Sequence, residues 1–146
     1  MSAFTGHRDH RIDGKDRVVI PSNFALAIEQ EAGGRLCLVP AEDAPCLEAY
    51  PGNVFDEIST GQIPNRFQGD LQRRRRFFQN AEEVRLKGPG RITLNRRFIE
   101  KYFRAGVVRV AGMNNYLELW DPETWEAHVG DGGQRSSSSG PGARRG

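Results

Sequence analysis

Two short basic turns contain the side chains of this 146-residue sequence that are best suited to bind a ligand. The first holds Lys15 and Arg17, and the second holds Lys87, Gly90 and Arg91. A glycine lets the backbone approach a phosphate closely, and an arginine beside it can clamp a phosphate or bond to a guanine edge. The turns are therefore candidate nucleic-acid contacts. The alternative is that both arginines pair with nearby acids and only stabilise their own turns.

The two turns belong to two copies of one unit. Residues 13–24 are echoed by residues 87–98, and residues 46–51 by residues 116–121. The offset is 74 between Arg17 and Arg91 and 70 between Glu48 and Glu118. A unit of about 50 residues buries too little surface to be stable alone. We therefore expect two copies that share one core as a pseudo-twofold module, which would present two equivalent arginines to a repetitive partner such as nucleic acid.

Positive charge is concentrated in the middle of the chain. The net charge is only +2, yet residues 66–109 carry 13 basic and 4 acidic side chains, a net +9. Residues 1–65 carry 5 basic and 10 acidic side chains, and residues 110–146 carry 3 basic and 5 acidic. This asymmetry is typical of a protein that binds a polyanion, and a solvated helix face is the alternative explanation.

The elements that position the turns can be read from hydrophobic runs and turn residues. We expect strands over residues 17–20, 36–39, 46–50, 91–94, 107–111 and 116–120. We expect helices over residues 23–32, 70–81 and about 96–104, with Ser22 and Asp70 as N-caps of the first two, and a last helical turn capped by Asp121. The expected organisation is a first repeat over residues 4–57, an insert over 58–81, a second repeat over 82–128 and a disordered Gly/Ser/Arg tail over 129–146.

Four consecutive arginines, Arg73–Arg76, fall within the helix of the insert. Successive helical side chains point in different directions, so the four guanidinium groups spread around more than half of the helix. They cannot all face one ligand. We expect the run to support contacts between subunits or with DNA, and Arg75 is its candidate DNA-binding residue.

No catalytic or metal-binding pattern is present in the sequence. There is no G-x-S-x-G motif, no P-loop and no metal-ligand spacing, so we expect no enzyme activity, no cofactor, no metal and no small-molecule substrate. Glu48 and Glu118 could face each other, but their place in apolar strands favours a structural role. Cys37 and Cys46 are expected to be small buried residues, and the histidines to be surface or packing residues.

No targeting or membrane signal is present either. The N-terminus has no apolar signal core, and no apolar run approaches the roughly 20 residues that span a bilayer. We expect a cytoplasmic protein that does not bind membranes.

The order of these features resembles that of the MraZ family, bacterial transcription regulators related to the AbrB-type looped-hinge DNA-binding fold. The resemblance covers about residues 4–128. The matching pieces are Phe4-x-Gly6, Ile12-Asp13-x-Lys15-x-Arg17, Ile20-Pro21, Cys46-Leu47, Tyr50-Pro51, Gly90-Arg91-Ile92, Gly112, Glu118-Leu119-Trp120 and Trp125. No single piece is specific, but their order together with the duplication is.

The resemblance implies an α+β fold: a β-rich, pseudo-dimeric, swapped-hairpin barrel built from two tandem repeats with flanking helices. It implies a ring-shaped homo-oligomer, associated with the nucleoid, that binds promoter direct repeats in double-stranded DNA. Such proteins usually act as repressors of the division and cell-wall gene cluster. The family's DNA-contacting arginines fall at Arg17 and Arg91 here.

Two departures from the family pattern affect the turns. Asp16 stands where the family usually has glycine, and Lys87 where it usually has aspartate. The first change places a carboxylate beside Arg17, and the second adds positive charge beside Arg91. We therefore expect Arg91 and Lys87 to dominate binding, with Arg17 contributing less.

Two other functions stay open at this point. One is an AbrB-like antitoxin or protein-interaction module with degenerate DNA binding. A second repeat argues against it, as does a tail without apolar anchors. The other is an enzyme that uses Glu48 and Glu118.

Overall fold

The structure, a computed structural model, describes residues 3–61 and 69–130. The tail expected to be disordered lies outside the described residues from position 131 onward. The strands are β1 (His7–Arg11), β2 (Arg17–Val19), β3 (Arg35–Pro40), β4 (Leu47–Pro51), β5 (Glu82–Arg85), β6 (Arg91–Thr93), β7 (Val107–Gly112) and β8 (Leu117–Trp120). The helices are α1 (Ser22–Ala32), α2 (Gly52–Ser59), α3 (Leu71–Gln79), α4 (Arg96–Tyr102) and α5 (Pro122–His128).

The two repeats are interleaved in one antiparallel sheet of order β1-β7-β8-β4-β3-β5. Strand β1 of the first repeat pairs with β7 of the second, and β5 of the second repeat pairs with β3 of the first. At the middle of the sheet β4 pairs with β8, and Glu48 lies directly opposite Glu118. Equivalent residues of the two copies therefore meet across an approximate twofold axis.

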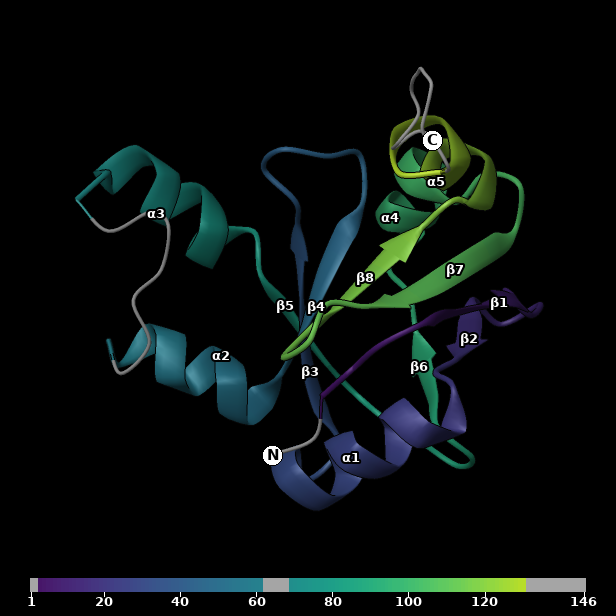
Figure 1. The fold of residues 1–146 in the computed structure, drawn as a ribbon, viewed down its shortest axis with the longest axis horizontal. Coiled ribbons are helices and arrows are strands. Elements are labelled where there is room, and N and C mark those ends of the chain that lie inside the picture. The colour runs from purple at the N-terminus through teal and green to yellow at the C-terminus, as the bar shows by residue number, and fades with distance from the viewer. Residues whose placement is uncertain (1–2, 62–68, 131–146) are drawn as a thin grey trace, which may run out of the picture.

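The second sheet is a short ribbon made only of β2 and β6, in which Val18 lies opposite Ile92. These two residues are also equivalent positions of the two copies. In Figure 1 the ribbon lies at the right, beside β1 and above α1, away from α2 and α3.

The α+β class is confirmed, but the described strands do not form a closed barrel. Strands β1 and β5 are the two edges of the six-stranded sheet and do not pair with each other. In the sequence β2 follows edge strand β1, and β6 follows edge strand β5. These two strands pair with each other instead of joining the sheet, so the sheet stays open.

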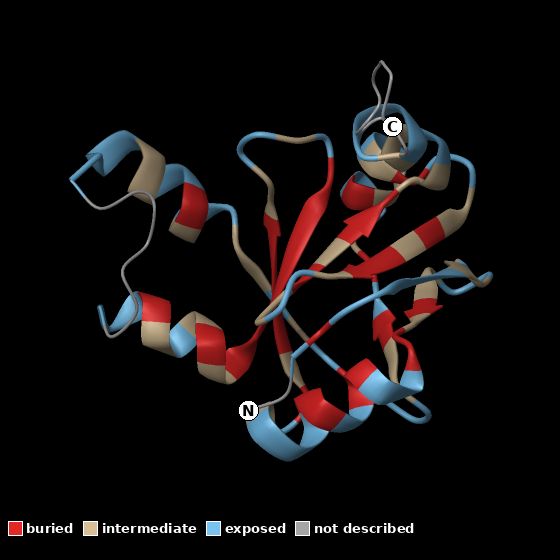
Figure 2. Cartoon of the chain, viewed as in Figure 1, coloured by how far each residue is buried: buried red, intermediate tan, exposed pale blue. Residues whose placement is uncertain are grey.

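Helices cover both faces of the sheet at β3 and β4, which explains why every residue of β4 is buried. Leu36, Leu38 and Leu47 belong to the main core cluster, whereas Val39 and Tyr50 belong to a second cluster formed with α2 and α3. Alternate residues of a strand point to opposite faces, so one strand supplies both clusters. Figure 2 shows the resulting band of buried residues along the central strands.

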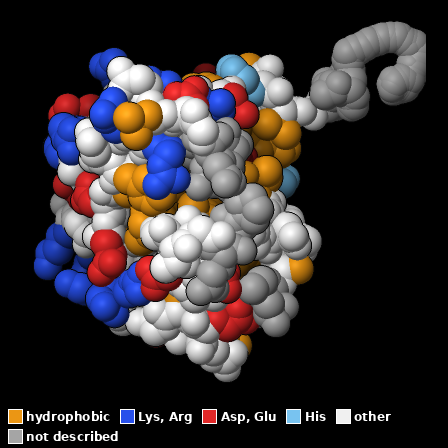
Figure 3. Space-filling view, turned by 90° about the vertical axis from the view of Figure 1, so that its left-hand side faces the viewer, with side chains coloured by type: hydrophobic (Ala, Val, Ile, Leu, Met, Phe, Trp, Pro, Cys, Tyr) orange, Lys and Arg blue, Asp and Glu red, His pale blue; other side chains and the backbone are white. Residues whose placement is uncertain are grey.

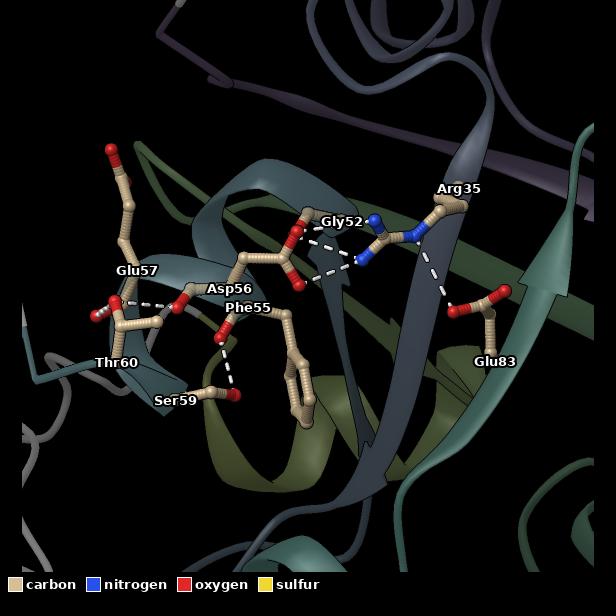
Figure 4. A network of polar contacts seen from close by, with 8 residues as sticks. All are labelled: Arg35, Gly52, Phe55, Asp56, Glu57, Ser59, Thr60 and Glu83. Atoms are coloured by element: carbon tan, nitrogen blue, oxygen red, sulfur yellow. Dashed lines mark hydrogen bonds and ion pairs between the residues drawn. The ribbon is translucent and has the colours of Figure 1, made fainter.

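Arg35 ties α2 to the sheet (Figure 4). Its guanidinium donates to both carboxylate oxygens of Asp56, at 2.9 and 3.1 Å, and its Nε lies 3.3 Å from Glu83 Oε1 in β5. It also donates to the carbonyl oxygen of Gly52. A Cβ at Gly52 would lie 2.7 Å from Arg35 atoms, so only glycine fits where α2 begins.

Helix caps were predicted well, with one error. Asp70 accepts a hydrogen bond from the N–H of Arg73, and Asp121 accepts one from the N–H of Thr124, as expected. Ser22 does not cap α1. The helix begins at Ser22 itself, and the preceding Pro21 offers no side-chain hydrogen bond. The carbonyl of Pro21 accepts from Ala25 and closes the first turn.

Candidate nucleic-acid interface

The first basic turn is organised by the carboxylate of Asp13. Its Oδ1 accepts hydrogen bonds from the backbone N–H groups of Lys15 and Arg17, both at 2.9 Å, and its Oδ2 accepts from Arg17 Nε at 2.9 Å. These bonds, led by the Arg17 N–H, lower the pKa of Asp13. The guanidinium of Arg17 is therefore already partnered within its own turn.

Asp16 occupies the left-handed region of the same turn, with φ 63°. Aspartate is one of the few residues other than glycine that adopt this conformation readily. Gly90, at the equivalent position of the second turn, has φ 78°. The two turns thus share the same backbone conformation at this position, and the Asp16 carboxylate lies 3.1 Å from Arg96 Nη1.

The second turn is closed by the backbone alone. Lys87 and Arg91 exchange two backbone hydrogen bonds, at 2.8 and 2.9 Å, because Lys87 has no carboxylate to do what Asp13 does. Within the described residues, neither Lys87 nor Arg91 has an ion-pair partner. The cations of the second turn are therefore more available to a ligand than those of the first.

Both arginines lie on the same face of the β2–β6 ribbon. Arg17 is opposite Thr93, and Arg91 is opposite Val19. Because side chains alternate along a strand, these four share one face, whereas Val18 and Ile92, each 1% exposed, point into the core. Arg17 and Arg91 are diagonal neighbours, which in antiparallel sheets lie roughly 7–8 Å apart. We define these four residues as the ribbon face.

The exposed lysines of the two turns flank the ribbon face at its opposite ends, since β2 and β6 are antiparallel and each follows its turn. Five of the six predicted site residues, Lys15, Arg17, Lys87, Gly90 and Arg91, are thus brought together. Val19 and Thr93 were not among the predicted site residues. Alternation along residues 17–20 and 91–94 places each on the same face as the arginine of its own strand, and the register of β2 and β6 joins the two halves.

Arg75 is not part of this cluster. Helix α3 lies at the opposite end of the molecule from the ribbon (Figure 1), and Arg75 Nη1 donates to Gln72 Oε1 of the same helix at 2.9 Å. Arg73 pairs with Glu42, and the guanidinium of Arg74 lies 5.2 Å from the ring centre of Phe78. Figure 3 views this end of the molecule, where hydrophobic side chains gather among lysine and arginine side chains.

Glu48 and Glu118 have structural partners at the centre of the sheet. Glu48 is 1% exposed and accepts from the hydroxyl of Tyr50 at 2.9 Å. Glu118 accepts from the indole N–H of Trp120 at 2.9 Å. The residue two positions further along each strand thus supplies a donor, so the buried Glu48 and the half-buried Glu118 each have a hydrogen-bond partner.

Other candidate chemistry is sparse in the part of the chain that the structure describes. No three His, Cys, Asp or Glu side chains there gather to hold a metal ion. Cys37 and Cys46 are buried and are not joined in a disulfide, and burial raises the pKa of Cys37 to about 11. Among residues 3–61 and 69–130, no helix has both the length and the apolar character to cross a bilayer.

The fold and this interface define a class of protein in which two interleaved repeats present paired basic turns on one small ribbon. Comparison with known proteins places the chain more narrowly. Residues 77–145 match the family described as "MraZ protein, putative antitoxin-like". A relative named "Transcriptional regulator MraZ" from Dehalococcoides mccartyi is 33% identical over 127 residues, covering 85% of this chain and 86% of the relative.

Two more relatives carry the same name. The protein of Acidovorax sp. is 30% identical, with 85% of this chain and 86% of the relative covered. That of Roseiflexus sp. is 26% identical, with 84% of each covered. The chain belongs to the MraZ family.

Proposed function

We propose that this chain is a sequence-specific regulator of transcription that binds double-stranded DNA through the ribbon face and its two flanking turns. One observation carries the proposal: Arg17 and Arg91 are diagonal neighbours on the partly exposed ribbon face, with the exposed Lys15 and Lys87 in the adjoining turns. The names of the relatives support the same function.

The finer proposal follows the family. The protein acts as a repressor of the division and cell-wall gene cluster and binds direct repeats in promoter DNA as a ring-shaped homo-oligomer. A single ribbon face makes few phosphate contacts and binds weakly at physiological salt. Several faces held on one ring and matched to several repeats gain affinity through effective concentration, without any new contact.

The two turns contribute unequally in this proposal. Arg17 must leave or share Asp13 in order to reach DNA, and Asp16 adds a second carboxylate to the same turn. Lys87 and Arg91 meet no such competition from the described residues. Most of the affinity therefore comes from the second turn.

A second candidate function is that of a protein-binding module related to antitoxins, which the family description itself names. In this case the ribbon face would bind an acidic protein partner and DNA binding would be degenerate. Duplication of the unit argues against it, since two equivalent arginines suit a repetitive polyanion better than a single protein partner.

The test is fluorescence anisotropy on a duplex taken from the DNA upstream of the gene, against a shuffled duplex, over a salt series. Wild type should prefer the native duplex, and its affinity should fall steeply with salt. Arg91→Ala should weaken binding by about tenfold or more and lower the salt slope by about 0.9 for a lost phosphate contact. Arg17→Ala should weaken it less.

Arg75→Ala is the matched control, since it removes the same charge from the far end of the molecule. Its affinity should stay within about twofold of wild type. Equal losses from Arg17→Ala and Arg91→Ala would contradict the unequal turns. Weak binding to both duplexes that no variant changes would contradict the proposed function and favour the protein-binding alternative. Far-UV circular dichroism checks that each variant is folded.

A further inference from the structure

The two copies differ at one position of the ribbon face. Arg17 and Arg91 are equivalent, and so are Val19 and Thr93, because both pairs are separated by 74 positions. Along the ribbon Arg17 lies opposite Thr93, and Arg91 lies opposite Val19. A rotation about the centre of the ribbon, at Val18 and Ile92, therefore superposes arginine on arginine but valine on threonine.

We propose that Val19 and Thr93 determine base specificity and fix the direction in which the ribbon lies on DNA. This inference rests on the proposed function. The ribbon face has the size and shape of a two-stranded β-ribbon that the major groove, about 12 Å wide, can admit. Val19 and Thr93 each lie directly opposite one arginine on this face, so they come close to the base edges if the arginines reach the groove.

The two side chains can recognise different groups on a base edge. Val19 offers only methyl groups, which suit the 5-methyl group of thymine. Thr93 offers one methyl group and one hydroxyl, and the hydroxyl can donate to or accept from a base edge. The half of the site under Val19 should therefore favour thymine, and the half under Thr93 should favour a base with a polar group within reach.

A consequence follows for the shape of the site. A protein with true twofold symmetry reads a palindrome, because each half of the ribbon asks for the same bases. In this ribbon the Val19 half and the Thr93 half prefer different bases, so the preferred DNA site is not palindromic and has a direction. Asp16 and Gly90 occupy equivalent positions of the two adjoining turns and differ in charge, which also makes the two ends of the ribbon unlike. A directional site is what a series of direct repeats requires.

The test uses a pool of randomised 20-base-pair duplexes selected by wild type, Val19→Thr, Thr93→Val and the double swap. Valine and threonine have nearly the same shape and are both β-branched, so the strands should be preserved. Each single swap should change the preferred base at one position, by about fourfold if one methyl contact is gained or lost. The double swap should exchange the two preferences. Val129→Thr, the same change in an exposed residue beyond α5, should leave the profile unchanged.

A second measurement isolates the methyl group. Replacing thymine by deoxyuridine in the selected duplex removes only the 5-methyl group. When the thymine under Val19 is replaced by deoxyuridine, wild type should bind about fourfold more weakly. The Val19→Ala variant should bind the thymine and deoxyuridine duplexes equally well. Selected profiles that are identical for wild type and both swaps would overturn the inference while leaving the proposed function intact. Failure of wild type to select any sequence would overturn both.

Discussion

Asp16→Asn should strengthen DNA binding, because it removes a carboxylate that the second turn, with Gly90 at the equivalent position, does not have. Asparagine also adopts the left-handed conformation that φ 63° requires, so the turn should keep its shape. The change takes away the partner of Arg96, whose side chain is 68% exposed, and leaves Arg17 with one neighbouring acid instead of two.

The expected gain is about one additional phosphate contact. Each such contact steepens the dependence of log affinity on log salt by about 0.9, which at 0.15 M salt corresponds to about fivefold tighter binding than without it. Stability should change by less than about 1 kcal/mol, because the Asp16–Arg96 pair is exposed. Anisotropy titrations at three or more salt concentrations would give both the affinity and the slope.

Asp43→Asn is the matched control, since it removes the same charge from the exposed loop between β3 and β4, far from the ribbon. The reasoning is refuted if Asp16→Asn leaves affinity and salt slope at their wild-type values. It is refuted equally if Asp43→Asn strengthens binding as much, because the effect would then belong to net charge rather than to the turn.

Three further predictions concern stability and reactivity. Gly90→Ala should lower the free energy of unfolding, measured in urea, by about 1–2 kcal/mol. A side chain at φ 78° is strained, and the new Cβ would lie 3.0 Å from the Cβ of Ala25. The control is Gly14→Ala, which should change the free energy of unfolding by less than about 0.5 kcal/mol because nothing lies within 4 Å of a Cβ there. Hydrogen bonds from Arg109 lower the pKa of Asp9 below its usual 3.8, so the stability they add is present above pH 3.8 and is lost as the pH falls through the lowered value. Asp9→Asn should therefore flatten that part of an acid-denaturation curve, and an unchanged curve would contradict the linkage. Burial raises the pKa of Cys37 to about 11, so Ellman's reagent at pH 8 should label it only in urea; equal labelling rates with and without urea would contradict its burial.

Most boundaries of helices and strands could be predicted from local sequence signals such as N-cap side chains. Asp70 and Asp121 were recognisable as N-caps because an acceptor side chain precedes each helix. Gly33, in the left-handed conformation, ends α1. The duplication also gave the equivalence of Arg17 and Arg91.

Pairing between distant strands could not be read from the sequence. Helix α2 was not expected, because no side chain caps its start, which Pro51 precedes. The exchange of β1 and β5 between repeats depends on which sheet edge each strand meets after the chain folds, and no periodicity encodes that choice. The ribbon face followed only once the register of β2 and β6 was known.

The pairing of β1 with β7 also has a consequence for synthesis of the chain. Arg109 binds Asp9 across 100 positions, and β2 must wait for β6, whose equivalent residues follow 74 positions later. At 5–20 residues per second the wait for β6 is on the order of 4–15 s. During that time β1 and β2 have no partner strands, and the nascent chain is open to chaperones and proteases. A fragment that ends before β6 therefore lacks the ribbon face.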